Sequence, residues 1–370
     1  MPQEMTSRVP RRLASVPLPL AGESLHSWVD HVAATYEIGR KHAMSLLGLE
    51  VENSAGRRLA YRTIQLTTAE AANVSAATGL TLDEVFAMTL SPLYVDDKGQ
   101  RIPDLWINAG GRNSFRSTKV LGGVCPKCLC ENDNRWPLLW YRRWSVICLE
   151  HSCYLVRECT SCDAPIQPWR FRDRSPGLCT GPMPASPSLR RPATVEHAGT
   201  RWCGKPLKDL PVLRTRDRVL LEIQAWLNTL PLVDGPGQEC DRAAEDDFNV
   251  LLKLVSWHAE PRHLAGADKA VREGFPRRTR SRKATNSFLG LGMAGMVRIA
   301  GQLAICADMD EATRWLLGDE EVDSPRPYPD HPWDDNDIWL FLMGSQRLQP
   351  ILKLSLGPIS YDKLTWRRDL

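Results

Sequence analysis

The sequence lacks the features of a membrane or secreted protein. Its longest apolar stretch, residues 286–309, contains Arg298 and several glycines, which makes it too polar for a membrane-spanning helix. Near the N-terminus, Pro17 and Pro19 interrupt an apolar stretch that a secretory signal would need intact. We therefore expect a cytoplasmic protein with no membrane partner. In that reducing compartment, 11 cysteines are expected to bind metal rather than to form disulfides.

A strong net charge is also lacking, and the formal value of +3 in 370 residues argues for no class of partner. Residues 101–210 differ from the rest, because they hold 17 Lys and Arg against 9 Asp and Glu. This basic middle segment is where we expect contact with nucleic-acid phosphates. The arginines predicted to make these contacts are Arg142, Arg143, Arg170, Arg172 and Arg174.

Complete catalytic motifs are missing as well. Residues 199–206 resemble a phosphate-binding loop, but Pro206 stands where the magnesium-binding hydroxyl belongs. Residues 290–295 fit a dinucleotide-binding glycine pattern without the preceding strand, so we interpret them as helix packing. The carboxylates in residues 334–337 need not converge on metals, and the histidines form no cluster typical of HNH nucleases. We therefore predict that the protein is not an enzyme.

What the sequence does contain is two cysteine-rich segments. Cys125 and Cys128 form a CxxC pair, and after 19 residues Cys148 and His151 form a CxxH pair. This spacing is typical of a tetrahedral zinc site, with Cys130 and Cys153 as neighbouring substitutes. Four protein donors leave no position for a reactive water, so we expect a structural zinc.

A second set of cysteines follows directly. Cys159 and Cys162 form another CxxC pair, and Cys179 and Cys203 are the remaining candidates. A segment rich in proline and arginine separates the last two, so spacing alone does not assign these ligands. Trp136, Trp140, Tyr141 and Trp144, between the ligands of the first set, are interpreted as the small hydrophobic core of that module, with base stacking as the alternative.

Helical periodicity surrounds the cysteine-rich segments. Apolar residues in 22–36 recur on one helical face, and residues 67–90 predict two helices joined at Gly79. That pair is compatible with a DNA-reading helix-turn-helix or with plain helical packing. Residues 215–230 and 245–260 return to helical periodicity, and the basic run 277–283 is interpreted as a surface loop.

Together, the motifs ESLHSW at residues 23–28, VCPKCL, VICLEHSCYLVRECTSC and WCGKPL resemble the TniQ family of transposition proteins, which includes TnsD-like target selectors. The resemblance covers roughly residues 17–207. It implies a mainly α fold with zinc ligands Cys125, Cys128, Cys148 and His151 in one site and Cys159, Cys162, Cys179 and Cys203 in a second. The interval between Cys179 and Cys203 is longer than the family usually has.

The resemblance also implies a domain order. A helical domain with helix-turn-helix character is expected over residues 1–120, zinc modules over 121–157 and 158–210, and a helical C-terminal domain over 211–370. Two structural Zn²⁺ ions are the expected cofactors.

For function, the resemblance implies a non-catalytic targeting adaptor for transposition. Its expected partners are an AAA+ ATPase, indirectly a transposase, and either target DNA or an RNA-guided CRISPR complex; it also allows a homodimer. The alternatives are a zinc-containing sequence-specific DNA-binding regulator without transposition partners, and a zinc-stabilised nuclease.

Overall fold

The structure, a computed structural model, describes residues 10–49, 62–63, 66–90, 123–142, 144–166, 177–182, 202–230, 239–275, 290–318 and 346–356. The chain divides into two compact units, with the boundary between Leu213 and Arg214. The described residues are mainly helical, as expected, and none of their helices is both long and apolar enough to cross a bilayer.

The N-terminal helices of the first unit form where the periodicity predicts them. Helix α1 (Leu25–Thr35) begins after Ser24, whose hydroxyl accepts a hydrogen bond from the Ser27 N–H. Its predicted apolar face is buried, with Trp28 and Val32 fully enclosed. Helix α2 (Arg40–Leu46) follows, and both helices contribute to one hydrophobic core.

The predicted pair of helices in residues 67–90 is also confirmed. Helix α4 (Thr68–Thr78) and helix α5 (Leu82–Phe86) each begin with a capping box, formed by Thr67 with Glu70 and by Thr81 with Glu84. Helix α4 ends at Gly79, whose φ of 80° is a left-handed conformation that glycine adopts without strain.

The cysteine-rich part of the first unit has little regular structure. It contains helix α6 (Pro126–Glu131), the 3₁₀ turns η1 (Leu138–Tyr141) and η3 (Leu207–Asp209), and the two-residue strands β1 (Ile147–Cys148) and β2 (Cys153–Tyr154). The strands pair antiparallel, with Cys148 opposite Cys153. The predicted aromatic core is confirmed, because Trp136, Trp140, Tyr141 and Trp144 are all buried.

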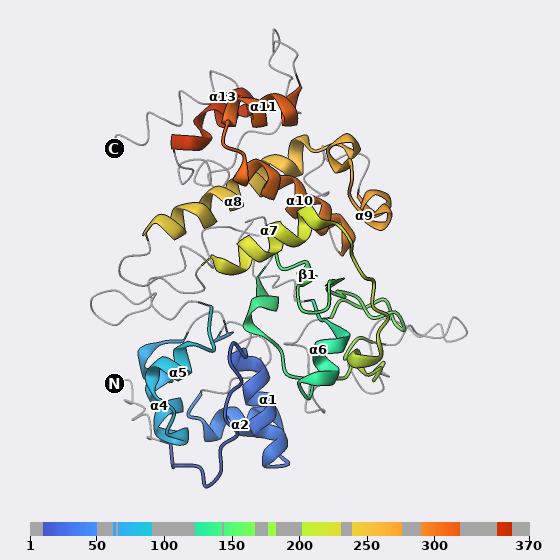
Figure 1. The fold of residues 1–370 in the computed structure, drawn as a ribbon. Coiled ribbons are helices and arrows are strands. Elements are labelled where there is room, and N and C mark those ends of the chain that lie inside the picture. The colour runs from blue at the N-terminus through green and yellow to red at the C-terminus, as the bar shows by residue number, and fades with distance from the viewer. Residues whose placement is uncertain are drawn as a thin grey trace, which may run out of the picture. The chain divides into compact units, whose positions relative to one another are not determined.

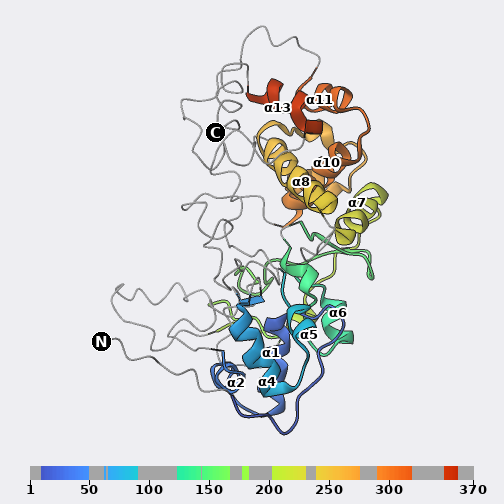
Figure 2. The same cartoon turned by 90° about the vertical axis from the view of Figure 1, so that its left-hand side faces the viewer.

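The described part of the second unit is built of helices. Those with described bounds are α7 (Arg218–Thr229), α8 (Glu239–His258), η4 (Pro261–Leu264), α9 (Lys269–Gly274), α10 (Leu291–Ile305), α11 (Met309–Leu317), η6 (Gln346–Leu348) and α13 (Gln349–Leu356). Helix α10 lies against α7, α8 and α9, and its position beside α7 and α8 can be followed in Figures 1 and 2.

Helix α10 explains two features of its sequence. The glycine pattern at residues 290–295 begins a packed helix, as predicted, rather than a nucleotide-binding turn. Further along α10, a Cβ on Gly301 would lie 2.3 Å from Ile223, so glycine permits the close approach of α7. The charged Arg298 is buried, and its Nε donates to Asp217 over 2.7 Å.

Candidate metal centres

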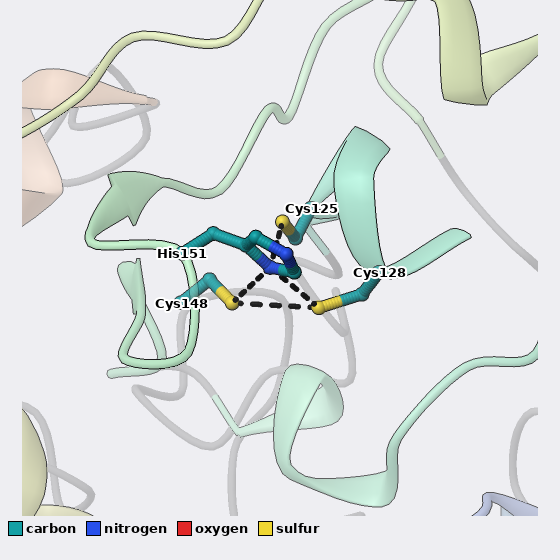
Figure 3. A group of neighbouring side chains, drawn as sticks. All are labelled: Cys125, Cys128, Cys148 and His151. Carbon is teal, nitrogen blue, oxygen red and sulfur yellow. Dashed lines mark hydrogen bonds between the residues drawn. The ribbon is translucent and has the colours of Figure 1, made fainter. Parts of the chain in front are cut away.

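The first cluster joins one short helix to one hairpin. Cys125 and Cys128 lie at the start and in the first turn of α6, where Pro126 suits the first helical position. Cys148 ends β1, and His151 lies in the turn that follows. The four side chains converge, as Figure 3 shows, and their donor atoms all lie within 4.8 Å of one another.

The separations of these donor atoms suit a tetrahedral zinc ion. Zinc bonds of about 2.3 Å to sulfur and about 2.0 Å to nitrogen place neighbouring donors roughly 3.5 to 3.8 Å apart. The Cys128 and Cys148 sulfurs are 3.5 Å apart. His151 Nδ1 lies 3.5 Å from the Cys125 sulfur and 3.2 Å from the Cys128 sulfur. The residues present therefore fit zinc without rearrangement.

A carboxylate orients the histidine. Nε2 of His151 lies 3.0 Å from Oε1 of Glu131, so Nδ1 faces the cysteines. Burial lowers the pKa of His151, but hydrogen bonds with Cys148 and Glu131 outweigh it and raise the pKa to about 9. A metal ion at this cluster would therefore have to displace a proton from Nδ1. Sequence spacing does not indicate Glu131, which holds the ring as carboxylates do in many zinc sites.

The second cluster brings together Cys159, Cys162, Cys179 and Cys203, again with all sulfurs within 4.8 Å. Cys159 and Cys203 are 3.7 Å apart, and Cys162 and Cys179 are 3.6 Å apart. Four sulfur donors at these separations also fit zinc.

Backbone pairing explains how Cys179 reaches Cys203 across the long interval. The Cys203 N–H donates to the Gly181 carbonyl, and the Gly204 N–H donates to the Cys179 carbonyl, both over 3.0 Å. Gly181 is required here, because a Cβ would lie 2.7 Å from the Cys162 sulfur. Gly181 and Gly204 follow Cys179 and Cys203 in the sequence. These two glycines are the sequence signal that could have assigned Cys179 and Cys203 to the second cluster.

Residues 14–155 match the model of the TniQ family. These residues belong to the TniQ family. The TniQ match contains the first cluster and ends before Cys159, and it indicates a protein associated with transposition. No curated protein sequence matches the chain.

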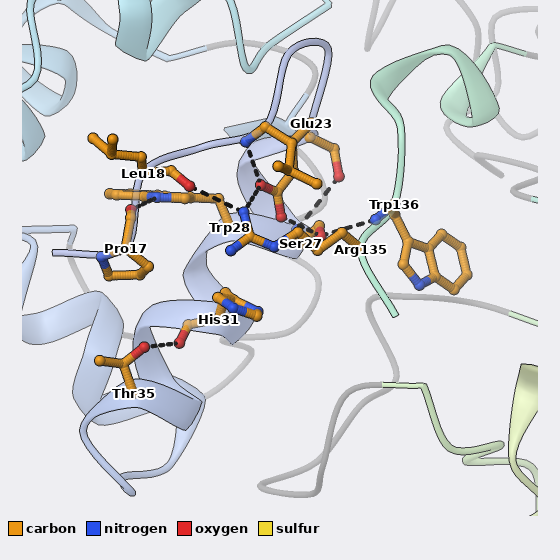
Figure 4. A network of polar contacts seen from close by, with 11 residues as sticks. Pro17, Leu18, Glu23, Ser27, Trp28, His31, Thr35, Arg135 and Trp136 are labelled. Carbon is orange, nitrogen blue, oxygen red and sulfur yellow. Dashed lines mark hydrogen bonds and ion pairs between the residues drawn. The ribbon is translucent and has the colours of Figure 1, made fainter. Parts of the chain in front are cut away.

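Within the TniQ region, the ESLHSW motif attaches α1 to the chain that follows α6. Glu23 Oε2 lies 2.8 Å from the Arg135 guanidinium, and the Ser27 hydroxyl donates to Glu23 Oε1 over 2.7 Å. The Trp136 N–H donates to the Ser27 hydroxyl over 2.9 Å, and the Trp28 indole donates to the Pro17 carbonyl. This network is drawn in Figure 4. The motif thus connects the N-terminal helices to the first cluster.

The residues of the TniQ helix pair α4–α5 carry no positive charge of their own, but the Arg12 guanidinium lies against Gly79 and Arg62 pairs with Glu70 over 2.8 Å. Residues 66–90 contain Glu70, Asp83 and Glu84 but no Lys or Arg. A hydrogen bond from the Thr81 N–H lowers the pKa of Glu84, which keeps this carboxylate charged. Because Arg62 pairs with Glu70 and Arg12 lies beside the turn at Gly79, this pair is compatible both with helical packing and with contact to phosphates.

The predicted phosphate contacts are only partly described. Arg142 is 6% exposed, and its guanidinium lies 5.7 Å from the centroid of the Trp144 ring. A phosphate contact by Arg142 would therefore require it to leave the core. Arg143, Arg170, Arg172 and Arg174 lie outside the described residues, as do the basic run 277–283 and the acidic residues 334–337.

Proposed function

We propose that the protein is a non-catalytic targeting adaptor for DNA transposition. It links recognition of a target to an AAA+ ATPase and, through that ATPase, to a transposase. The TniQ match over residues 14–155 is the observation that carries this proposal. Recognition of the target occurs directly on DNA or through an RNA-guided CRISPR complex, and the adaptor acts alone or as a homodimer.

Zinc has a structural role in this proposal. Cys125, Cys128, Cys148 and His151 hold one ion, and Cys159, Cys162, Cys179 and Cys203 hold a second. Because each set supplies four protein donors, neither ion keeps a position for an activated water. The ions fix the short elements of residues 121–157 and 158–210 as two modules between helical domains at 1–120 and 211–370.

Direct DNA contact, where it occurs, uses the basic middle segment. Arg143, Arg170, Arg172 and Arg174 are the proposed phosphate contacts, because residues 101–210 hold 17 Lys and Arg against 9 Asp and Glu. Removing one arginine that binds a phosphate should reduce the salt dependence of log K by roughly 0.9 on duplex DNA. Neutralising the four arginines together measures their contribution to affinity.

The test is reconstituted targeted insertion with a partner AAA+ ATPase and transposase, omitting each component in turn. We expect insertion at the target to require the full chain. Cys148→Ser should abolish targeted insertion by disrupting the first cluster, whereas Cys306→Ser, outside both clusters, should support normal insertion. Targeted insertion that continues unchanged without the protein would disprove the adaptor role.

The alternative is a zinc-containing, sequence-specific DNA-binding regulator without transposition partners. It predicts a defined footprint on DNA and no effect on insertion. The adaptor predicts capture of an AAA+ ATPase in a pull-down, with or without a CRISPR effector. Metal-dependent DNA cleavage by this chain alone, abolished by Asp334→Ala or Asp337→Ala, would instead indicate a nuclease.

A further inference from the structure

A fifth buried donor lies beside the first cluster. Cys153 is fully buried on β2, directly opposite Cys148 in the hairpin register. Side chains of directly opposed residues project from the same face of an antiparallel pair. The Cys153 sulfur lies 3.6 Å from the Cys125 sulfur, which is the separation of two ligands on one zinc ion.

The histidine differs from the three cysteines that complete the proposed set. Cys125, Cys128 and Cys148 are buried, and His151 lies in the hairpin turn with 11% of its side chain exposed. Ser152, with a φ of 44°, separates His151 from Cys153. The same hairpin therefore places two further side chains, the His151 imidazole and the Cys153 thiol, beside the three cysteines. Of these two, the imidazole belongs to the set whose donor atoms all lie within 4.8 Å of one another, whereas the thiol lies beside the Cys125 sulfur.

We propose that Cys153 is a reserve ligand of the first site, which takes the fourth position when His151 leaves it. In this exchange the bond between zinc and Nδ1 breaks, a bond between zinc and the Cys153 sulfur forms, and the thiol proton passes to solvent. The inference rests on the proposal that the first cluster binds zinc.

Two measurements on the full-length protein test the exchange. The first is zinc content per chain, and the second is the thiolate-to-metal charge-transfer absorbance after cobalt(II) replaces zinc, which increases with the number of bound thiolates. The variants are His151→Ala, Cys153→Ala and the double variant. A matched control combines His151→Ala with Cys306→Ser, which removes a thiol outside both clusters.

We expect His151→Ala to keep the wild-type zinc content and to gain charge-transfer absorbance, because a sulfur replaces a nitrogen. The His151→Ala/Cys153→Ala variant should lose the metal of the first site, whereas the control with Cys306→Ser should behave like His151→Ala. Cys153→Ala alone should leave both measurements unchanged.

Two results would overturn the inference. Loss of the first metal from His151→Ala alone would show that no reserve ligand exists. Retention of metal without a gain in absorbance would show that water fills the fourth position. Wild-type protein without zinc at the first site would refute the zinc proposal itself, and this result is read separately from the behaviour of the variants.

Discussion

The cysteine-rich part of the first unit and the helical second unit are stabilised in different ways. The former has a six-residue helix and two-residue strands, and five of its core residues are cysteines of the two clusters. The latter has the 20-residue helix α8 and the 15-residue helix α10, which is buried along most of its length. Short elements bury too little apolar surface to hold themselves, so metal bonds can supply what packing cannot.

The difference also appears in which atoms approach one another most closely in each region. Around the clusters, close approach is between donor atoms, as for the sulfurs of Cys128 and Cys148. In the second unit, close approach is between helices, as where Gly301 meets Ile223. Metal removal should therefore damage one region, and overpacking should damage the other.

The largest expected effect is that of removing zinc. Structural zinc contributes about 10–16 kcal/mol in zinc-finger peptides, so chelation or Cys148→Ser should unfold the first cluster. Hydrogen–deuterium exchange of the full chain should show reduced protection in residues 123–166 and retained protection in α8 and α10. An equal decrease of protection in both regions would contradict the idea that metal stabilises only the cysteine-rich part. Cys306→Ser serves as the neutral control.

A smaller loss of stability is expected from breaking the ion pair that connects α1 to the chain after α6. Arg135→Ala leaves the Glu23 carboxylate buried, with only 1% of its side chain exposed, and no guanidinium beside it. Breaking a buried pair costs about 3–5 kcal/mol, which denaturant unfolding would measure.

The matched control for this pair is Arg262→Ala in the second unit. Arg262 and Glu260 form an ion pair in which both side chains are about half exposed. Such a pair contributes about 0–1 kcal/mol. Similar decreases in stability for Arg135→Ala and Arg262→Ala would contradict the importance of burial at Glu23.

The next largest loss of stability is expected from overpacking the second unit. Gly301→Ala places a Cβ against Ile223, and overpacking of a core costs about 1–3 kcal/mol. Alanine also favours helices by about 1 kcal/mol over glycine, so a gain in stability would mean that α7 and α10 can separate at little cost. Thermal unfolding measures the sign, and the zinc content should not change.

Local patterns were sufficient to predict the helices and the first cluster. Periodicity predicted α1 and the α4–α5 pair. The first cluster was predicted from two pairs, Cys125 with Cys128 and Cys148 with His151, because the members of each pair lie within one turn of chain. The second cluster depends on pairing between residues 178–182 and 202–206, and no local pattern shows which distant segments will pair.

Contacts between distant residues, and the burial of individual charged side chains, could not be predicted from the sequence. Glu23 and Arg135 are 112 residues apart, so their ion pair could not be found from spacing. The charge of Arg142 predicts a phosphate contact, but its side chain is buried and lies over the Trp144 ring. Charge predicts contact with phosphate only where the side chain reaches the surface.

The smallest expected effect is a pH dependence confined to the second unit. Burial lowers the pKa of His263 below its ordinary value of 6.5. Its Nδ1 accepts from the Glu260 N–H over 2.9 Å, and Nε2 lies 3.0 Å from the Trp315 carbonyl, so the folded state favours the neutral ring. The unfolded chain binds a proton more readily, and stability should therefore fall as the pH decreases below about 6.5.

His263→Gln should reduce this dependence of stability on pH in α11 and the residues around η4. Hydrogen–deuterium exchange at pH values on either side of 6.5, corrected for intrinsic exchange rates, measures it. An identical slope in the wild-type and His263→Gln proteins would show that the acid sensitivity arises elsewhere, and exchange in residues 123–166, around the first cluster, provides the reference from the other region.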